Sequence, residues 1–199
     1  MKQTILYATA VSLILLAGTT MKAQTKKYPT PDIAAKPYYY DEKNNEAVDM
    51  ETGDLEEKKR TRGYGGIGTQ ESVWFMPGEK SIVRITKKPK LNFLVKFTDN
   101  NAANNDVNKL FILLKLTYNP KTKARELVTM KQSSWSEKTE ENYETIRFTS
   151  QKVLEVKDEG GYGVELLVRM LTVENLEPGE YVWMTGGWDG RAALFFGVD

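Results

Sequence analysis

Neither cysteine nor histidine occurs in the sequence, and these two absences exclude more chemistry than any motif suggests. Without a thiol there can be no disulfide, no cysteine nucleophile and no lipid anchored through a cysteine. Without an imidazole there is no Ser-His-Asp triad, no histidine acid or base, and no zinc site of the ordinary kind. An enzyme built from this chain would have to rely on carboxylates, serine or lysine.

A surplus of charge of either sign is also missing. Lys and Arg number 28 and Asp and Glu 27, which gives a formal net charge of +1. Binding to nucleic acid depends on a basic surplus that displaces counterions from phosphates, so nucleic acid is not an expected partner. Over its 199 residues the chain is 40% hydrophobic, 11% aromatic and 28% charged, proportions that are typical of a folded globular protein.

The longest hydrophobic run lies near the start of the chain, from Ile5 to Gly18, after the basic residue Lys2. A short basic start, an apolar core of this kind and a small residue such as Ala23 at its exit are typical of a secretory signal peptide. We therefore expect residues 1–23 to be removed and the rest to be exported to the periplasm, the cell surface or the medium of a bacterium. An uncleaved anchor is the alternative, but a spanning helix needs about 20 apolar residues.

No later segment is apolar enough to suggest a membrane span in the mature chain. The longest later run that we consider, Leu110–Leu114, has five residues and is followed by Lys115. We expect residues 24–31 to form an extended lead-in that contains prolines, and residues 32–199 to form a single domain. A domain of this size can bury enough surface to fold without disulfides.

Most of the domain shows the two-residue alternation of half-buried β-strands. Apolar and polar residues alternate over residues 91–97 and 162–170, whereas residues 107–117 are apolar on both faces, as in a covered central strand. Further strands are predicted at residues 72–76, 81–86, 125–131, 144–150, 152–157, 180–184 and 193–198, with turn signals between them. The pattern predicts an all-β fold, an antiparallel β-sandwich of the immunoglobulin-like or a related kind, with few or short helices.

The opening part of the domain, residues 32–62, is less regular. Residues 38–40 and 46–50 are expected to pair as a hairpin around a turn at Asn44-Asn45. The charged stretch 51–62 has no apolar stripe, and a short surface helix or a linker is predicted there. The glycines of residues 63–68 lack the Gly-Lys-Ser/Thr ending of a phosphate loop, so a flexible entry or a bulge before a strand is expected.

Residues 176–181, Leu-Glu-Pro-Gly-Glu-Tyr, contain a turn that is typical of β-sandwiches. Pro178 presets φ at the first corner, Gly179 accepts a positive φ, and Leu176 and Tyr181 can close on the core. The segment resembles the Leu-x-Pro-Gly-x-Tyr turn that precedes a late strand in immunoglobulin-like sandwiches of bacterial surfaces.

Over roughly residues 36–199 the chain also resembles a family of short secreted, β-rich proteins of unknown function from Gram-negative bacteria. The resemblance lies in the tyrosine-rich opening hairpin, the glycine-rich link, the Pro-Gly-Glu-Tyr turn and the ending Phe-Phe-Gly-Val-Asp. It implies a secreted β-rich domain, but no activity, ligand or functional residue.

Two loop tryptophans are the candidate ligand-binding residues. Trp188 lies between glycines beside Asp189 and Arg191, and Trp135 lies in a polar loop. An exposed indole at such a tip can stack on a sugar ring or anchor a protein partner, with the neighbouring charges for polar contacts. The alternative is that each indole folds back over the sheet. The other two tryptophans lie within strand patterns and are expected in the core.

An Asn- and Asp-rich loop, residues 99–106, supplies oxygen atoms of the kind that bind calcium. It does not fit the EF-hand pattern, because Ala103 and Asn104 occupy positions that need a ligand and a glycine. We expect a strand connection made of Asx turns, with calcium as the alternative. No other metal site and no cofactor are predicted.

Carboxylate pairs are the remaining route to catalysis, as in glycoside hydrolases. The nearest candidates are Asp158-Glu159, Glu140-Glu141, and Asp189 with Glu180. Each lies in a charged or turn-like stretch where water should leave its pKa ordinary, whereas a general acid needs burial or a neighbouring charge. We therefore do not expect an enzyme.

The sequence as a whole favours a non-enzymatic binding module of the bacterial envelope. A protein partner is expected, held by buried loop aromatics or by addition of a strand at an exposed sheet edge. The first alternative is a carbohydrate-binding module that uses Trp188, and the second is a small carboxylate-dependent hydrolase.

Overall fold

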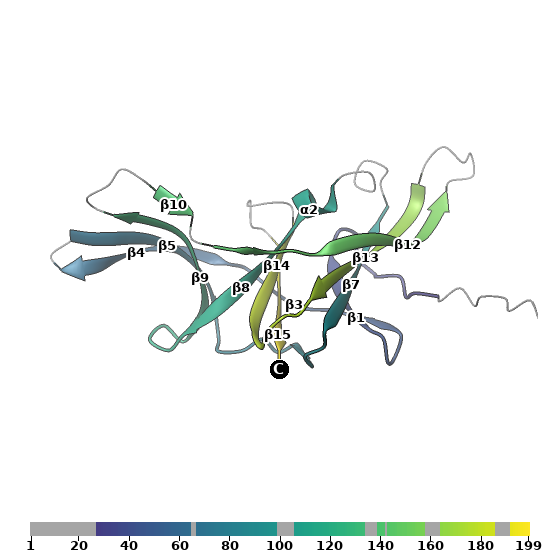
Figure 1. Ribbon diagram of the computed structural model, residues 1–199, viewed down its shortest axis with the longest axis horizontal. Helices are drawn as coiled ribbons and strands as arrows, with labels where there is room; N and C mark the ends of the chain where they lie inside the picture. The colour runs from purple at the N-terminus through teal and green to yellow at the C-terminus, as the bar shows by residue number, and fades with distance from the viewer. Residues whose placement is uncertain are drawn as a thin grey trace, which may run out of the picture.

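The computed structural model of the chain describes residues 27–64, 67–98, 106–133, 139–141, 143–157, 164–185 and 192–199. Over these residues the regular structure consists of strands and one short helix, and the strands form two sheets (Figure 1). The predicted all-β, antiparallel, sandwich-like fold is therefore confirmed. The predicted signal peptide lies outside the described residues. Among the helices of the described part, none has the length and apolar character needed to cross a membrane.

The first sheet has five strands in the order β12-β13-β7-β1-β2, each antiparallel to its neighbours. Their bounds are β12 Thr149–Lys157, β13 Val164–Glu174, β7 Lys90–Phe97, β1 Pro37–Asp41 and β2 Glu46–Val48. The predicted opening hairpin is confirmed, since β1 and β2 pair from Asp41 with Glu46 to Tyr39 with Val48. In its turn Asn45 has a φ of 55°, a left-handed conformation that asparagine adopts more readily than most residues.

The second sheet has ten strands, and its main path is β3-β15-β14-β8-β9-β5-β4. These strands are β3 Glu51–Gly53, β15 Ala192–Val198, β14 Gly179–Thr185, β8 Phe111–Asn119, β9 Ala124–Ser133, β5 Ile67–Pro77 and β4 Glu56–Tyr64. Beside this path, β6 (Arg84–Ile85) pairs with β15, β10 (Thr139–Glu141) with β9, and β11 (Thr145–Ile146) with β8. The pair of β6 and β15 is parallel.

The strand predicted to be central is confirmed from Phe111 onward, because β8 lies between β14 and β9. Its first residues differ from the prediction, since α2 (Val107–Leu110) is one turn of helix. The carboxylate of Asp106 accepts a hydrogen bond from the backbone N–H of Asn108 and so caps this turn.

The prediction of a helix or linker over residues 51–62 was wrong, because this stretch forms β3 and β4. β4 pairs with β5 in an unbroken antiparallel register from Glu56 with Phe75 to Tyr64 with Ile67. Its many charged side chains are compatible with a strand because β4 is the last strand of the sheet, where such side chains stay in water.

The described residues of the glycine-rich link belong to the paired ends of β4 and β5, and not to a flexible entry or a bulge. Gly63 pairs with Gly68 close to the turn. A β-carbon at Gly68 would lie 1.8 Å from the carbonyl oxygen of Arg62, so only glycine fits that position.

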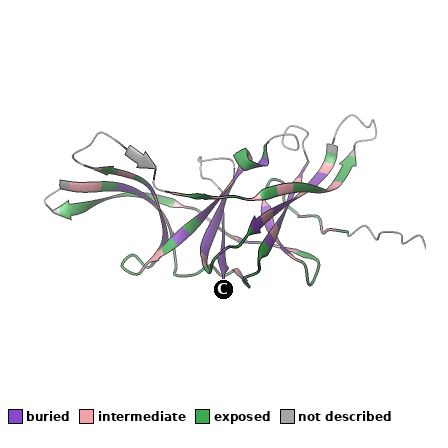
Figure 2. Cartoon of the chain, viewed as in Figure 1, coloured by how far each residue is buried: buried purple, intermediate pink, exposed green. Residues whose placement is uncertain are grey.

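The main core lies between the two sheets, with Trp183 of β14 fully buried in it. The rings of Phe93, Phe111 and Phe148 surround its indole at centroid distances of 5.4, 6.5 and 5.0 Å. Strands of both sheets contribute further buried residues, including Leu91, Val95, Phe97, Leu167, Leu171, Val173, Leu194 and Phe196. Figure 2 shows the resulting concentration of buried positions on β7, β13, β14 and β15. Burial of each such side chain contributes roughly 1.5–3 kcal/mol.

The first sheet is apolar on its outer face as well. A separate cluster there contains Tyr40, Leu94, Val168 and Met170. The lead-in covers part of it, because the ring of Tyr28 lies 5.5 Å from that of Tyr40 and Pro31 is buried. Ala34 then forms a parallel bridge with Lys96 of β7. The lead-in is thus packed against the sheet from Tyr28 onward.

The predicted turn before β14 is confirmed. Leu176 and Tyr181 both belong to the main core, and Gly179 has a φ of 158°. The hydroxyl of Tyr181 donates a hydrogen bond of 2.5 Å to the carbonyl oxygen of Glu177, which closes the turn.

The second sheet extends beyond the first. β8 and β9 pair only where residues 117–119 meet residues 124–126, after which they diverge. β11 then pairs with β8, and β10 pairs with β9. Figure 1 shows β9, β5 and β4 curling away to the left, while the first sheet lies to the right. We call β9, β5, β4 and β10 the curled half, and the first sheet with β15, β14 and β8 the sandwich half.

Candidate binding site

The four residues predicted to bind a ligand belong to segments 134–138 and 186–191. Trp135, Trp188, Asp189 and Arg191 all lie outside the described residues. Their roles in stacking on a sugar or anchoring a partner therefore remain predictions. The other two tryptophans lie on strands, and Trp183 is part of the core as expected.

A groove of about 1000 Å³ lies where the two halves meet, and we call it the β8–β9 groove. Its walls are Arg60, Arg62 and Gly63 of β4, Lys115 and residues 117–122 of β8 and the following hairpin, residues 126–128 of β9, and Tyr143 with Glu144. Pockets that bind small ligands commonly have volumes of about 300–1,000 Å³, so the groove is large enough for a ligand or a protein loop.

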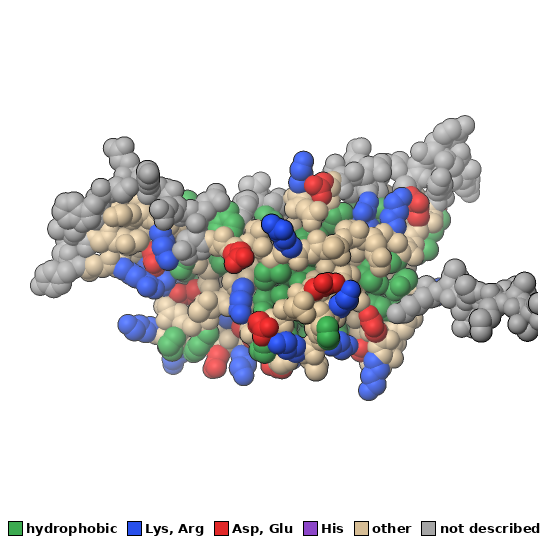
Figure 3. Space-filling model, viewed as in Figure 1, with side chains coloured by type: hydrophobic (Ala, Val, Ile, Leu, Met, Phe, Trp, Pro, Cys, Tyr) green, Lys and Arg blue, Asp and Glu red, His purple; other side chains and the backbone are tan. Residues whose placement is uncertain are grey.

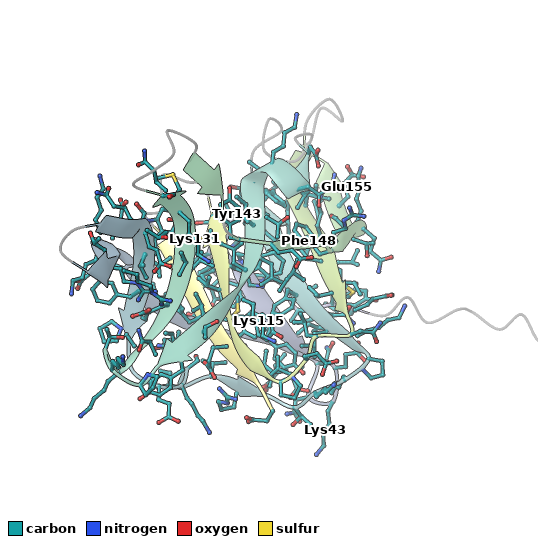
Figure 4. The ribbon with its side chains drawn as sticks, turned by 60° about the vertical axis from the view of Figure 1, so that its left-hand side comes forward. Lys43, Lys115, Lys131, Tyr143, Phe148 and Glu155 are labelled. Carbon is teal, nitrogen blue, oxygen red and sulfur yellow. The ribbon has the colours of Figure 1, made fainter. Side chains whose placement is uncertain are left out.

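The groove exists because β8 and β9 separate after a few paired residues. Tyr143 and Glu144, which precede β11, line the groove at this gap. The side chain of Tyr143 also packs against an apolar cluster of the second sheet that includes Leu116 and Leu127. Figure 4 shows Tyr143 close to β8, on which Lys115 lies further along.

A buried carboxylate, Glu126, forms part of the groove and is only 7% exposed. Arg60 donates a hydrogen bond of 2.7 Å to it, and the Nε of Arg60 donates another of 2.7 Å to Glu71. Asn119 and Thr122 donate to Glu126 at 3.0 and 2.6 Å. We call these five residues the groove network.

Hydrogen bonds within the groove network favour the ionised forms of Glu126 and Arg60. Burial by itself would raise the pKa of Glu126, but hydrogen bonds from Thr122, Asn119 and Arg60 outweigh it, so this pKa lies below its usual range. Burial likewise would lower the pKa of Arg60, and its bonds to Glu71 and Glu126 raise it instead. A general acid needs a raised pKa, so Glu126 is unsuited to that role.

Exposed charges at the groove are mainly cationic. Arg62, Lys115 and Lys121 are exposed there, and Glu144 is the exposed carboxylate. Arg62 also lies 3.1 Å from Glu71. Over the rest of the face in Figure 3, acidic and basic side chains are interspersed. The groove is therefore a polar, partly aromatic site with a modest positive bias.

Of the carboxylates considered for catalysis, the structure describes the side chain of Glu180 alone. Asp158, Glu159 and Asp189 lie outside the described residues, and the side chains of Glu140 and Glu141 are not described either.

Glu180 corrects the expectation of a solvated carboxylate, because it is only 8% exposed. It accepts a hydrogen bond of 2.7 Å from the backbone N–H of Ser81 and forms an ion pair with Arg84. Arg125, 1% exposed, lies 3.8 Å from it. Glu180 therefore holds a loop onto the sheet.

The same ion-pair network includes Glu51, whose carboxylate accepts hydrogen bonds of 3.0 and 3.1 Å from Arg125. Burial would raise the pKa of Glu51, but Arg125 and Ser81 overcome this and the pKa is lowered. At its other end the network includes Asp199, which pairs with Arg84. The network packs against β15, since Cζ of Arg125 lies 5.1 Å from the centroid of the Phe195 ring.

Metal ligands are not grouped in the described part of the chain, where no set of three or more acidic residues could hold an ion. Residues 99–105 of the loop considered for calcium lie outside the described residues. Asp106, at its end, is engaged as the cap of α2.

Comparison with protein-family models, with curated proteins and with solved structures gave no match to the chain. The resemblances noted from the sequence therefore remain predictions.

The groove residues were not predicted from the sequence. The available signals were the charged Arg125-Glu126 pair at the start of β9, directly before the apolar Leu127 and Val128, and the Asn119-Pro120 turn that precedes it. Neither signal indicates that Arg60, far away in the chain, completes the network.

Proposed function

We propose that the mature chain is an exported, non-enzymatic binding module of the bacterial envelope, and that it contacts a protein partner through the β8–β9 groove. The observation that supports this is the groove itself, which combines arginines with tyrosine in an open site of about 1000 Å³. Arg and Tyr are the residue types that most often dominate the energy of protein interfaces, together with Trp.

Binding accounts for the groove better than catalysis does. Its buried carboxylate, Glu126, already accepts hydrogen bonds from three side chains, which stabilise the ionised form. Glu144 is exposed and lies at the rim. A retaining or inverting hydrolase needs one protonated and one ionised carboxyl facing the same substrate, and the groove network opposes the protonated form.

A carbohydrate ligand is the second candidate for the same groove. Tyr143 offers an aromatic ring there, and Thr117 and Lys121 offer polar groups beside it. Such a ligand would be an envelope or extracellular glycan, and it would use the groove in addition to, or in place of, the predicted Trp188 loop.

Site-specific photocrosslinking tests the proposal. A photoreactive residue would replace Lys121 in the groove and, as a matched control, Lys43 in the β1–β2 turn; both lysines are exposed, and Figure 4 shows Lys43 far from Lys115 and Tyr143. We expect a discrete adduct with an envelope protein from position 121 but not from position 43. An Arg62→Ser exchange in the same chain should reduce this adduct.

Affinity electrophoresis in gels that contain soluble polysaccharides separates the two ligand classes. Retardation that the Arg62→Ser exchange or a Tyr143→Ala exchange reduces would favour the glycan. Equal crosslinking from positions 121 and 43, together with unchanged mobility in every gel, would contradict a role for the groove in binding.

A further inference from the structure

β4 is an unusual edge of the second sheet. It has nine residues and comes last in the strand order, and no strand pairs with its outer side within the described residues. Other sheet edges are short or irregular: β2 and β3 have three residues each, and the register of β12 shifts twice. Short strands and bulges discourage pairing with another chain, whereas the register of β4 is regular throughout.

Charge along β4 is ordered by sign. Glu56 and Glu57 come first, and Lys58, Lys59 and Arg60 follow. Antiparallel pairing places the first half of one strand opposite the second half of the other. A strand that begins acidic and ends basic is therefore complementary to a second copy of itself, and opposite charges that face each other across two strands stabilise the pair.

We propose that the protein forms a homodimer in which β4 pairs antiparallel with β4 of a second copy, with Lys58 at the two-fold axis. This register places Glu57 opposite Lys59 of the second copy, and Glu56 opposite Arg60. Each pair occurs twice. Directly opposite residues lie on the same face of an antiparallel sheet, so the two kinds of pair occupy opposite faces of the joined sheet.

The ion pair between Glu57 and Lys59 of the second copy contributes most to the preference for this register. Both side chains are exposed, and neither forms an ion pair in the described part of the chain. They are thus available to a second copy. Arg60, in contrast, is already shared between Glu71 and Glu126. Glu56 opposite Arg60 therefore adds less than Glu57 opposite Lys59.

Lys58 would place two like charges at the two-fold axis, but its side chain is drawn back from the strand edge. Its ammonium group lies 4.1 Å from the centroid of the Phe75 ring on the neighbouring strand β5. This cation–π contact directs the charge over the sheet and away from the second copy. The contact thereby weakens the repulsion between Lys58 and Lys58 of the second copy, which is the one pair of like charges in this register.

The dimer has a consequence for the groove. β4 contributes Arg60 and Arg62 to the wall of the β8–β9 groove. A two-fold axis perpendicular to the sheet puts both grooves on the same face of one continuous sheet. A partner with two binding segments then engages both sites, and linkage raises its overall affinity without any new contact.

Sedimentation velocity of residues 24–199 over a range of protein concentrations tests the dimer. We expect a monomer–dimer equilibrium that shifts to monomer as salt is added, because exposed charge pairs are screened. The Glu57→Lys exchange replaces both attractive pairs by repulsive ones and should raise the dimer dissociation constant about tenfold or more. Glu79→Lys changes the net charge equally at an exposed loop position and should leave the equilibrium unchanged.

The charge-swapped variant, Glu57→Lys with Lys59→Glu, is the decisive test. It restores opposite charges across the axis and should recover the dissociation constant of the natural chain to within about threefold. Equal thermal stability of all variants at low concentration establishes that each monomer folds. A chain that is monomeric at every concentration, or a dimer that is insensitive to Glu57→Lys, or a swap that fails to restore association, would overturn the proposal.

Discussion

The sandwich half and the curled half differ in what lies on the inner face of the second sheet. In the sandwich half, the inner face of β14 and β15 packs on the first sheet, and Trp183 and Phe196 are fully buried there. In the curled half, no strand of the first sheet covers the corresponding face within the described residues, and Glu71, Glu126 and Arg60 lie on it. One half is held mainly by apolar contacts, and the other is held to a larger extent by ion pairs and hydrogen bonds.

This difference explains why the groove lies where it does. A face closed by large aromatic side chains leaves no space for a ligand, since protein interiors are packed as tightly as organic crystals. A face lined by a hydrogen-bonded ionic network can stay open to water, because its polar groups are satisfied on the sheet itself. The fold thus separates a closed apolar region from an open polar groove within a single continuous sheet.

Truncation of one tryptophan in each half should give the largest contrast. Trp183→Ala removes a fully buried ring and should lower the free energy of unfolding by about 3–5 kcal/mol. Trp74→Ala, in β5 of the curled half, removes a partly buried ring and should cost clearly less. Urea denaturation of both variants measures the difference. Equal losses would show that the two halves are equally dependent on apolar packing.

Removal of one charge from the groove network should have a smaller effect. Glu126→Gln keeps the shape of the side chain but loses the ionic part of its contacts with Arg60, Asn119 and Thr122. We expect a loss of about 1–2 kcal/mol at pH 7. Hydrogen exchange should quicken in residues 67–77 of β5 and stay unchanged in residues 90–97 of β7. Faster exchange in both segments would mean that the network supports the sandwich half as well.

Acid should abolish the difference in stability between the natural chain and the Glu126→Gln variant. The pKa of Glu126 is lower in the folded chain than its usual value, so its ionised form stabilises the fold above the unfolded-state pKa of roughly 4.3. That contribution is lost as the pH falls through the folded-state pKa. The urea midpoints of the natural chain and of Glu126→Gln should therefore differ at pH 7 and converge once the pH has fallen below the folded-state pKa of Glu126. A difference that persists in acid would show that the network acts through packing and not through charge.

Sequence patterns correctly predicted strands where one face or both faces of the strand are apolar. The alternation over residues 91–97 correctly identified the inner face of β7. For β13 it identified Val168 and Met170, but these belong to the cluster on the outer face of the first sheet. The inner face carries Leu167 and Leu171 instead. Alternation shows that two faces differ, but it does not show which of them meets the other sheet.

Patterns failed where tertiary position outweighed local composition. The charges of residues 56–62 suggested a helix or a linker, yet β4 is a strand because β5 offers it a partner along its whole length. The groove network joins residues of β4, β5 and β9, whose proximity depends on strand order. Strand order cannot be deduced from one sequence, so the residues of the groove network could not be grouped in advance. The residues that were predicted, the loop tryptophans, lie outside the described part of the chain.

The position of the last strand has a consequence for how the chain reaches this fold. β15 lies between β14 and β3, and Phe195 pairs with Glu51. The backbone N–H of Lys87 likewise donates to the carbonyl oxygen of Asp199. Contacts between segments so distant in sequence form slowly, because a long loop must close before they stabilise anything. Until residues 192–198 have been synthesised, β14 lacks one neighbour, and its edge exposes unpaired backbone groups that can pair with another chain.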